Sequence, residues 1–135
     1  MATFNKFYSF SEAVYEKVHN LGSDSLKVAL TNTLPVATNT VLANITEVAY
    51  TNCSTRAVTQ ASSAQTTGTY KLVLNDLILT ATGTVGPFRY IVLYNDTATN
   101  DELIGWFDYG VSVTLANTDT FTIDFAGVTG ALTHV

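Results

Sequence analysis

The sequence predicts a mainly β protein, a single antiparallel β-sandwich or jelly roll of about eight strands with one N-terminal α-helix. Three observations lead to this class. Only 13% of the residues are charged, and the chain is rich in threonine, a β-branched residue suited to strands. Short apolar runs recur along the chain, with turn-forming residues between them about every eight to twelve positions. A helical hydrophobic period occurs once, near the N-terminus.

The chain has 135 residues and no linker or internal repeat divides it, which predicts one domain. We expect residues 1–9 to form an N-terminal arm, residues 10–20 the helix and residues 26–135 the β-sandwich. A chain of this mass buries about two-thirds of its surface on folding, so a single apolar core can stabilise it. Cys53 is the only cysteine, which excludes a disulfide framework within the chain.

The helix is predicted over residues 10–20 because a capping pattern precedes an apolar stripe. Ser9 and Glu12 have the spacing of a capping box, in which each side chain bonds a backbone N–H at the helix start. Apolar residues then recur at the helical period, at Phe10, Val14 and Val18. Gly22 is suited to the position that follows a helix, because glycine adopts positive φ without strain.

Beyond Gly22, apolar and polar residues alternate, which is typical of strands. The expected strands are residues 26–31, 47–51, 56–60, 69–74, 77–82, 88–94, 103–109, 111–115, 121–125 and 132–135. The expected loops are residues 32–40, 62–68, 83–87 and 95–101. Residues 88–94 are almost continuously apolar, which predicts a strand covered on both faces.

Two segments leave alternatives open. Residues 41–45 fit either a short helical turn or irregular chain. Residues 69–74 and 77–82 are separated only by Asn75 and Asp76. They form either one long bent strand or a tight hairpin, and we favour the bend.

The sequence carries no catalytic signature, and we predict that the protein is not an enzyme. His19 and His134 lie near opposite ends of the chain, and no nucleophile-elbow motif accompanies them. Cys53 is interpreted as an inert thiol. No cofactor is expected, because the chain has no glycine-rich phosphate loop, and its single cysteine and two distant histidines do not make a zinc site.

Two groups of acidic residues leave a choice between chemistry and structure. Asp96, Asn100, Asp101 and Glu102 form an oxygen-rich loop, which either binds an ion such as calcium or is a solvated loop. The EF-hand spacing is absent, and the solvated loop is favoured. Asp108 and Asp124 lie in predicted strands, where they form either a carboxylate pair or two outward-facing residues.

Charge and hydropathy limit the partners of the chain. The net charge is −5, and the six basic residues are scattered singly, so we expect no nucleic-acid binding. No window approaches eighteen consecutive apolar residues, and the N-terminus has no apolar signal region. We therefore expect neither a membrane partner nor a signal peptide.

Aromatic residues gather in two regions of the chain. Phe4, Phe7, Tyr8 and Phe10 crowd the N-terminal segment, where they either pack on the sheet or anchor an arm into a partner. A second group spans residues 88–109 and forms either core and subunit contacts or a sugar-stacking platform. The candidate partner-contact residues are Phe4, Phe7, Tyr8, Phe10, Tyr90, Trp106 and Tyr109.

Four segments carry a resemblance that runs over most of the chain: MATFNKFYSF, AVYEKVHNLGSDSLKVALTNTLPVATNTVLANITEVAY, SSAQTTGTYKLVL and GPFRYIVLYNDTATNDELIGWFDYG. In these segments the chain resembles a family of small virion structural proteins of tailed bacteriophages. Within this class the chain is most similar to capsid decoration (cement) proteins. Two alternatives stay open: a phage tail or host-adsorption component, and a carbohydrate-binding β-sandwich module that would use Trp106 and Tyr109.

The resemblance implies a protein on the outer surface of the capsid, within the virion. Its partner would be the major capsid protein, whose assembled lattice it would bind and stabilise. The resemblance also implies a homo-oligomer, with a trimer favoured. We expect the N-terminal arm and helix to dock on the lattice, and the aromatic strands to form the contacts between copies.

Overall fold

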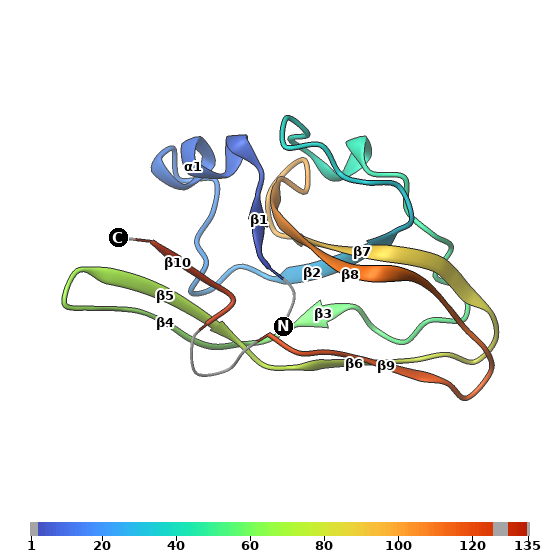
Figure 1. Ribbon diagram of the computed structural model, residues 1–135. Helices are drawn as coiled ribbons and strands as arrows, with labels where there is room; N and C mark the ends of the chain where they lie inside the picture. The colour runs from blue at the N-terminus through green and yellow to red at the C-terminus, as the bar shows by residue number, and fades with distance from the viewer. Residues whose placement is uncertain (1–2, 126–129, 135) are drawn as a thin grey trace.

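The computed structural model of the protein describes residues 3–125 and 130–134. In this part of the chain, ten β-strands and one α-helix are arranged in two layers of antiparallel sheet (Figure 1). The predicted class, mainly β with one N-terminal helix, is confirmed. The two layers are compatible with the predicted β-sandwich, and the jelly-roll connectivity stays a prediction.

The first layer is a five-stranded sheet in the order β1-β8-β7-β2-β3. Its strands are β1 (Asn5–Lys6), β2 (Leu26–Thr31), β3 (Ala57–Val58), β7 (Val85–Asn95) and β8 (Leu103–Leu115). β7 lies at its centre and pairs with β2 on one side, where Leu30 faces Ile91, and with β8 on the other. The predicted strand with the most continuous apolar run, residues 88–94, is therefore in the middle of the large sheet.

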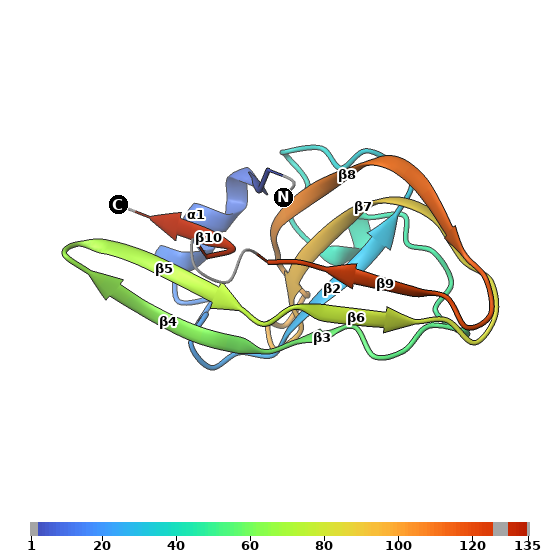
Figure 2. The ribbon, with the colours of Figure 1, turned by 60° about the horizontal axis from the view of Figure 1, so that its bottom comes forward.

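The second layer consists of two smaller sheets that lie end to end (Figure 2). One has the order β10-β5-β4, and the other pairs β6 with β9. Their strands are β4 (Gln60–Thr66), β5 (Thr69–Leu74), β6 (Leu77–Thr80), β9 (Thr120–Ile123) and β10 (Leu132–His134). Because β5 and β6 belong to different sheets, residues 69–82 form a bend and not a hairpin, as we favoured.

Apolar side chains fill the space between the two layers. Leu30 and Phe88 from the large sheet, and Leu72 and Leu79 from the second layer, are fully buried there. These residues alternate along their strands with more exposed neighbours in β5 and β6, as the period of two requires.

A second apolar cluster lies on the outer face of the large sheet. Its buried members are Phe7, Ala29, Val92, Tyr94 and Leu103. The segment of residues 32–56, which includes the 3-10 helix η1 (Leu42–Asn44), crosses this face, and its Leu42 and Ile45 cover the cluster (Figure 1). Farther along the same segment, Val48, Tyr50 and Cys53 pack against the cluster between the layers. β2 and the second half of β7 are consequently buried on both faces, which confirms the prediction for residues 88–94.

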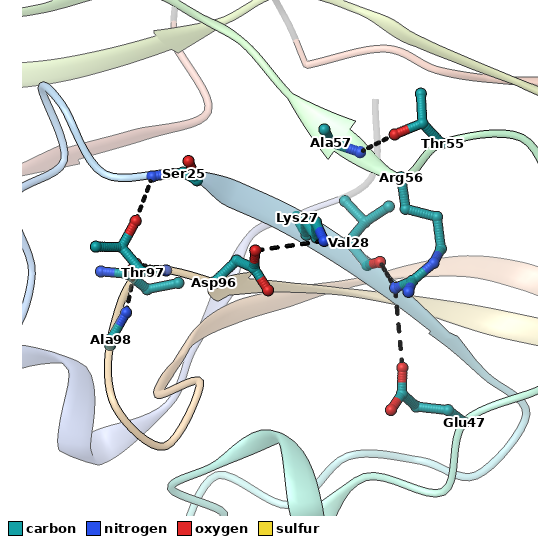
Figure 3. Close-up of polar contacts among 11 residues, drawn as sticks. Ser25, Lys27, Val28, Glu47, Thr55, Arg56, Ala57, Asp96, Thr97 and Ala98 are labelled. Atoms are coloured by element: carbon teal, nitrogen blue, oxygen red, sulfur yellow. Dashed lines mark hydrogen bonds and ion pairs between the residues drawn. The ribbon is translucent and has the colours of Figure 1, made fainter.

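Arg56 attaches the end of this covering segment to β2. Its Nη1 atom donates a hydrogen bond of 2.7 Å to the Val28 carbonyl oxygen and lies 3.9 Å from Glu47 Oε1 (Figure 3). The guanidinium also lies over the Tyr50 ring, 3.6 Å from its centroid. One cation therefore holds both the covering segment and the backbone of β2.

Residues 47–51 are not a strand, contrary to the prediction. The Val48 N–H donates to the Leu30 carbonyl oxygen at 3.0 Å, as in a β-ladder. The Leu30 N–H, however, donates to the Tyr50 hydroxyl at 2.9 Å. Because a side-chain oxygen replaces the backbone carbonyl, no regular ladder forms.

The helix α1 spans Tyr8–Tyr15, two residues earlier than predicted at its start. Phe7 is the N-cap residue and makes no side-chain cap, so the predicted capping box of Ser9 and Glu12 is wrong. The Tyr8 N–H instead donates to the Ala37 carbonyl oxygen at 2.9 Å, from the covering segment. A backbone carbonyl from a distant segment therefore accepts a hydrogen bond from the start of the helix, where the sequence predicts a cap by a local side chain.

The helix also ends earlier than predicted, at a Schellman motif. Lys17 has φ 70 and its N–H donates to the Val14 carbonyl oxygen, while the Val18 N–H donates to that of Ala13. Lys17 therefore occupies the left-handed position that we assigned to Gly22. A lysine in this conformation costs about 1 kcal/mol relative to glycine.

Residues 62–68, predicted as a polar loop, form most of β4 and the turn after it. Their Ala, Ser, Gln and Thr side chains have no apolar alternation, so they carry no strand signal. Pairing with β5, for example of Ser63 with Leu72, holds them in extended conformation. Thr67 and Gly68, at φ 50 and 89, form the two-residue hairpin turn.

Glycines with positive φ lie inside two strands and explain two further differences. Residues 103–109 and 111–115 are one continuous strand, β8, which passes through Gly110 at φ 99. The predicted turn at residues 83–87 lies largely within β7, where Gly86 has φ 110 and the register with β8 shifts. Both glycines change the direction of a strand without ending it.

Candidate interaction surface

The N-terminal segment is part of the large sheet and not a free arm. Asn5 and Lys6 pair with Trp106 and Gly105 of β8. The Phe7 N–H donates to the backbone of β8 as well, and the Phe7 side chain is fully buried. The predicted arm over residues 1–9 is therefore wrong for residues 3–9, and residues 1–2 lie outside the described part of the chain.

The predicted contact residues differ in exposure: some are buried, some are half-buried and two are exposed. Phe7, Phe10 and Tyr90 are buried within the chain, so their prediction as partner contacts is wrong. Phe4 and Trp106 are half-buried: Trp106 packs against Phe7 at a centroid distance of 4.7 Å, and Phe4 against Phe107 at 5.6 Å. Of the predicted set, the exposed residues are Tyr8, at 70% exposure, and Tyr109, at 51%.

Tyr8 is exposed because its two aromatic neighbours are directed inward. Phe7 enters the outer apolar cluster, and Phe10 enters the cluster between the layers. Both anchors flank the first turn of α1, so the Tyr8 side chain is presented from a backbone that is held on either side. The sequence shows that aromatic residues are concentrated in this segment. The packing shows which of them are buried, Phe7 and Phe10, and that Tyr8 is exposed.

Two apolar residues of the covering segment are exposed shortly before Ala37. Leu34 is 60% exposed and Val36 is 55% exposed. The hydrogen bond from the Tyr8 N–H to the Ala37 carbonyl oxygen joins the two segments. We call the surface formed by Tyr8, Leu34 and Val36 the apolar cover face. Its sequence signal is a pair of apolar residues on either side of Pro35, inside a loop otherwise made of turn formers.

The helix extends the apolar cover face. Val14 and Tyr15 of α1 are exposed, Tyr15 at 77%. In Figure 1 both segments lie along the upper side of the molecule, α1 above β10 and the covering segment above β7 and β2. Exposed apolar side chains on neighbouring segments favour contact with another macromolecule.

A second exposed apolar region lies at the open edge between β8 and β9. Tyr109 and Val111 are exposed there, and a cavity of about 370 Å³ lies beside Tyr109. Phe107, Phe121 and Phe125 line part of this cavity. Tyr109 packs on Phe121, whereas Trp106 packs on the opposite face of β8. Trp106 and Tyr109 therefore do not form a shared stacking platform.

Asp108 and Asp124 line the same cavity, so the structure brings the predicted carboxylate pair into one region. Asp108 accepts two hydrogen bonds from Arg89, of 2.9 and 3.1 Å. This Arg89 contact lowers the pKa of the Asp108 carboxyl below its ordinary value. A carboxylate held ionised in this way is unsuited to donate a proton as a general acid.

The loop over residues 95–101 uses its oxygens within the chain. Asp96 pairs with Lys27 of β2 at 3.3 Å, and Thr97 Oγ1 accepts from the Ser25 N–H at 2.8 Å (Figure 3). Glu102 accepts hydrogen bonds from Asn100. Among the described residues, no group of three or more His, Cys, Asp and Glu side chains could hold a metal ion.

Cys53 is half-buried and makes no disulfide. Burial raises the pKa of its thiol above the ordinary value, and Arg56 opposes this effect only in part. A smaller fraction of the thiol is therefore ionised at neutral pH, which lowers its reactivity as a nucleophile.

His19 lies in a buried polar cluster that the sequence analysis did not predict. Its Nδ1 atom is 3.0 Å from Asn95 Nδ2, which also donates to Asp24 Oδ2 at 2.7 Å. Asn95 Oδ1 accepts from the Thr97 and Ala98 N–H groups, which determines the orientation of the amide. The His19 Nε2 atom has no hydrogen-bond partner within the described part of the chain.

Comparisons of the chain with protein-family models, with curated proteins and with solved structures found no match. Within residues 3–125 and 130–134, the structure contains no helix long and apolar enough to cross a membrane.

Proposed function

We propose that the protein is a structural protein of a bacteriophage virion, a capsid decoration protein that binds the assembled lattice of the major capsid protein. The observation that carries the proposal is the apolar cover face of Tyr8, Leu34 and Val36, exposed at 70%, 60% and 55%. The sequence resemblance supports the class of protein, and the β-rich fold agrees with it. The proposed role is adhesion and not catalysis.

The apolar cover face is the proposed contact with the capsid. Phe7 and Phe10 anchor the backbone around Tyr8, so little conformational entropy is lost when this face is covered. Aromatic residues that are held in place in this way are typical centres of binding energy. In this mechanism the exposed side of α1 and the covering segment replace the flexible arm that we expected.

The effect on the capsid follows from mass action. A protein that binds the assembled lattice and not the free subunits shifts the equilibrium toward assembly. Repeated weak contacts over many copies add through multivalency. The net charge of −5 suits the outer surface of a shell whose interior holds DNA.

A homo-oligomer, with a trimer favoured, remains part of the proposal. Tyr109 and Val111, exposed at 51% and 59% at the open edge of β8, are the residues of the aromatic strands available for contact between copies. Tyr90 is excluded from this role by its burial.

The proposal is tested by adding purified protein to capsids that lack it. The variants Tyr8→Ser, Leu34→Ser and Val36→Ser each remove one side chain of the apolar cover face. We expect each to weaken binding by about tenfold, as for a residue at the centre of an interface. The measurements are the number of bound copies per capsid and the thermal stability of the capsid.

The matched control is Ile78→Ser, because Ile78 is 59% exposed but lies on β6 in the other layer. We expect this variant to bind like the unmodified chain. Equal binding by all four variants would contradict the proposal for the apolar cover face. A copy number of a few tens or fewer per virion, measured against the major capsid protein, would favour a tail component instead.

A further inference from the structure

Within residues 3–125 and 130–134, the outer edge of β4 pairs with no other strand. β4 pairs with β5 on one side, and it is the last strand of the β10-β5-β4 sheet. Figure 2 shows β4 on the border of the molecule, in a hairpin that extends away from the large sheet. We propose that two copies of this chain pair antiparallel through β4, about a twofold axis at Ala64, and join their three-stranded sheets into one. This inference concerns the free chain in solution and does not depend on the proposed capsid function or on the homo-oligomer proposed for the capsid-bound protein.

The hairpin geometry identifies the backbone groups on the open edge. Thr67 and Gly68 form a two-residue turn, so Thr66 and Thr69 are the hydrogen-bonded pair that closes it. Backbone groups of an antiparallel strand alternate between its two sides. The N–H and C=O groups of residues 63 and 65 therefore point away from β5.

The opposite edge of β5 supports this alternation. The Leu72 carbonyl oxygen, which is opposite Ser63, accepts from the Ala131 N–H at 2.8 Å. Leu72 thus bonds toward β10 and not toward β4. Its partner Ser63 must direct its own backbone groups to the free side.

The β4 edge lacks most devices that protect a free strand from pairing. Residues 57–70 contain no charged residue and no proline. The one irregularity is the register shift between Gln60 and Ser62, and residues 61–66 are all exposed. The other strands that end a sheet are shorter than the seven residues of β4: β1 and β3 have two residues each, β10 has three, and β6 and β9 have four each. A long, exposed and uncharged edge is a template for another strand.

The sequence of β4 favours a second copy as the occupant. The chain has a net charge of −5, yet two copies of β4 meet without like charges. A twofold axis at Ala64 places Ser63 opposite Gln65 of the second copy, and each such pair exchanges two backbone hydrogen bonds. Ala64 then faces Ala64 of the second copy in a non-hydrogen-bonded pair, where facing side chains lie closest and the alanine methyl groups leave the approach of the strands unobstructed. The outer edge of β4 is therefore complementary to the same edge of a second copy.

Pairing of one short strand buries less surface than a standard interface, so we expect weak association, in the range of about 10 μM to 1 mM. Sedimentation equilibrium across this range should give a mass that rises from 14.5 kDa toward twice that value. A mass that remains 14.5 kDa at the highest concentration, or that rises toward three times 14.5 kDa without a dimer, would overturn the twofold pairing.

Charge exchange tests the position of the axis. Ala64→Lys alone and Ala64→Glu alone place like charges opposite each other, so each variant should be monomeric. An equimolar mixture places opposite charges in contact and should restore the dimer. The matched controls are Ala116→Lys and Ala116→Glu, at an exposed residue beyond β8, which should self-associate like the unmodified chain. Dimers of the single Ala64 variants, or no recovery on mixing, would contradict the proposed axis.

Backbone amide exchange provides a test that needs no variant. In the unmodified chain, the N–H groups of residues 62 and 64 face β5 and should be protected at every concentration. The N–H groups of Ser63 and Gln65 should become protected only at high concentration, by at least about tenfold. Exchange of Ser63 and Gln65 that is independent of concentration would overturn the inference.

Discussion

His19 shows how a residue expected at a helix end becomes a buried polar group. The Asn95 amide nitrogen donates toward His19 Nδ1, because the Asn95 oxygen is used by two backbone N–H groups. Nδ1 must therefore be an acceptor, and the imidazole is neutral with its proton on Nε2. Burial lowers the pKa of His19 below its ordinary value of 6.5, while the nearby Glu102 and Asp24 oppose this shift.

The lowered pKa of His19 predicts that acid destabilises the protein. Below about pH 6.5 the unfolded chain binds a proton at His19 that the folded chain does not, so the free energy of unfolding decreases as the pH falls. One such proton contributes at most about 1.4 kcal/mol per pH unit. We expect His19→Gln to reduce the slope of stability against pH between about pH 7.5 and 5.5, measured by urea unfolding. An unchanged slope would contradict a lowered pKa at this residue.

Lys17 illustrates why the end of the helix was misplaced. Because glycine adopts positive φ at least cost, the sequence predicts the left-handed position at Gly22. The chain turns at Lys17 instead, since His19 and Leu21 are buried beyond it. Burial of the segment that follows outweighs a local strain of about 1 kcal/mol.

At the scale of elements, β1 depends on a glycine in the strand opposite. Gly105 of β8 pairs with Lys6, and the Phe4 ring occupies the space where a Cβ atom at residue 105 would lie. The same Cβ would approach the Asn5 carbonyl oxygen to 2.7 Å. The absence of a side chain at Gly105 therefore lets the N-terminal strand lie against β8.

Substitution of Gly105 by alanine should displace β1 from β8. The Phe4 ring can turn away, but the Asn5 backbone must shift, so we expect faster amide exchange in residues 4–7 and a loss of stability of about 1–3 kcal/mol. Gly68→Ala is a useful control, because Gly68 lies in the hairpin turn with open space around it. Its positive φ makes a similar loss of stability possible, but exchange in residues 4–7 should not change.

The strand β4 marks the limit of pattern-based prediction at this scale. An apolar period identifies a strand that buries one face, but β4 is exposed along nearly its whole length. Its conformation depends on β5, which carries the apolar pattern, and on the turn at Thr67 and Gly68. A signal was present in the turn residue Gly68, which closes the segment that we interpreted as a loop.

At the scale of the whole molecule, two apolar clusters share one large sheet. Phe7 belongs to the outer cluster and Phe88 to the cluster between the layers. The strands β7 and β8 contribute buried residues to both clusters. The two clusters should therefore unfold together.

The variant Phe7→Ala tests this cooperativity. Loss of a fully buried aromatic side chain should lower the free energy of unfolding by about 3–5 kcal/mol. Trp106, the only tryptophan, packs on Phe7 and reports on the outer cluster by its fluorescence. In the variant, we expect the fluorescence transition to coincide with the loss of β-structure followed by circular dichroism. An earlier fluorescence transition would indicate that the outer cluster unfolds on its own.

The sequence by itself determined the β-rich class and the positions of β2, β5 and the second half of β7, and it favoured the bend near Asn75 and Asp76. Those features follow from the local hydrophobic period and from the turn-forming residues, which do not depend on contacts with distant segments. The tertiary structure decided the start of α1, the burial of Phe7 and Phe10, and the exposure of Leu34 and Val36. Each depends on a partner from a distant segment, such as the Ala37 carbonyl oxygen or the face of β8, and one local stretch of sequence does not specify that partner.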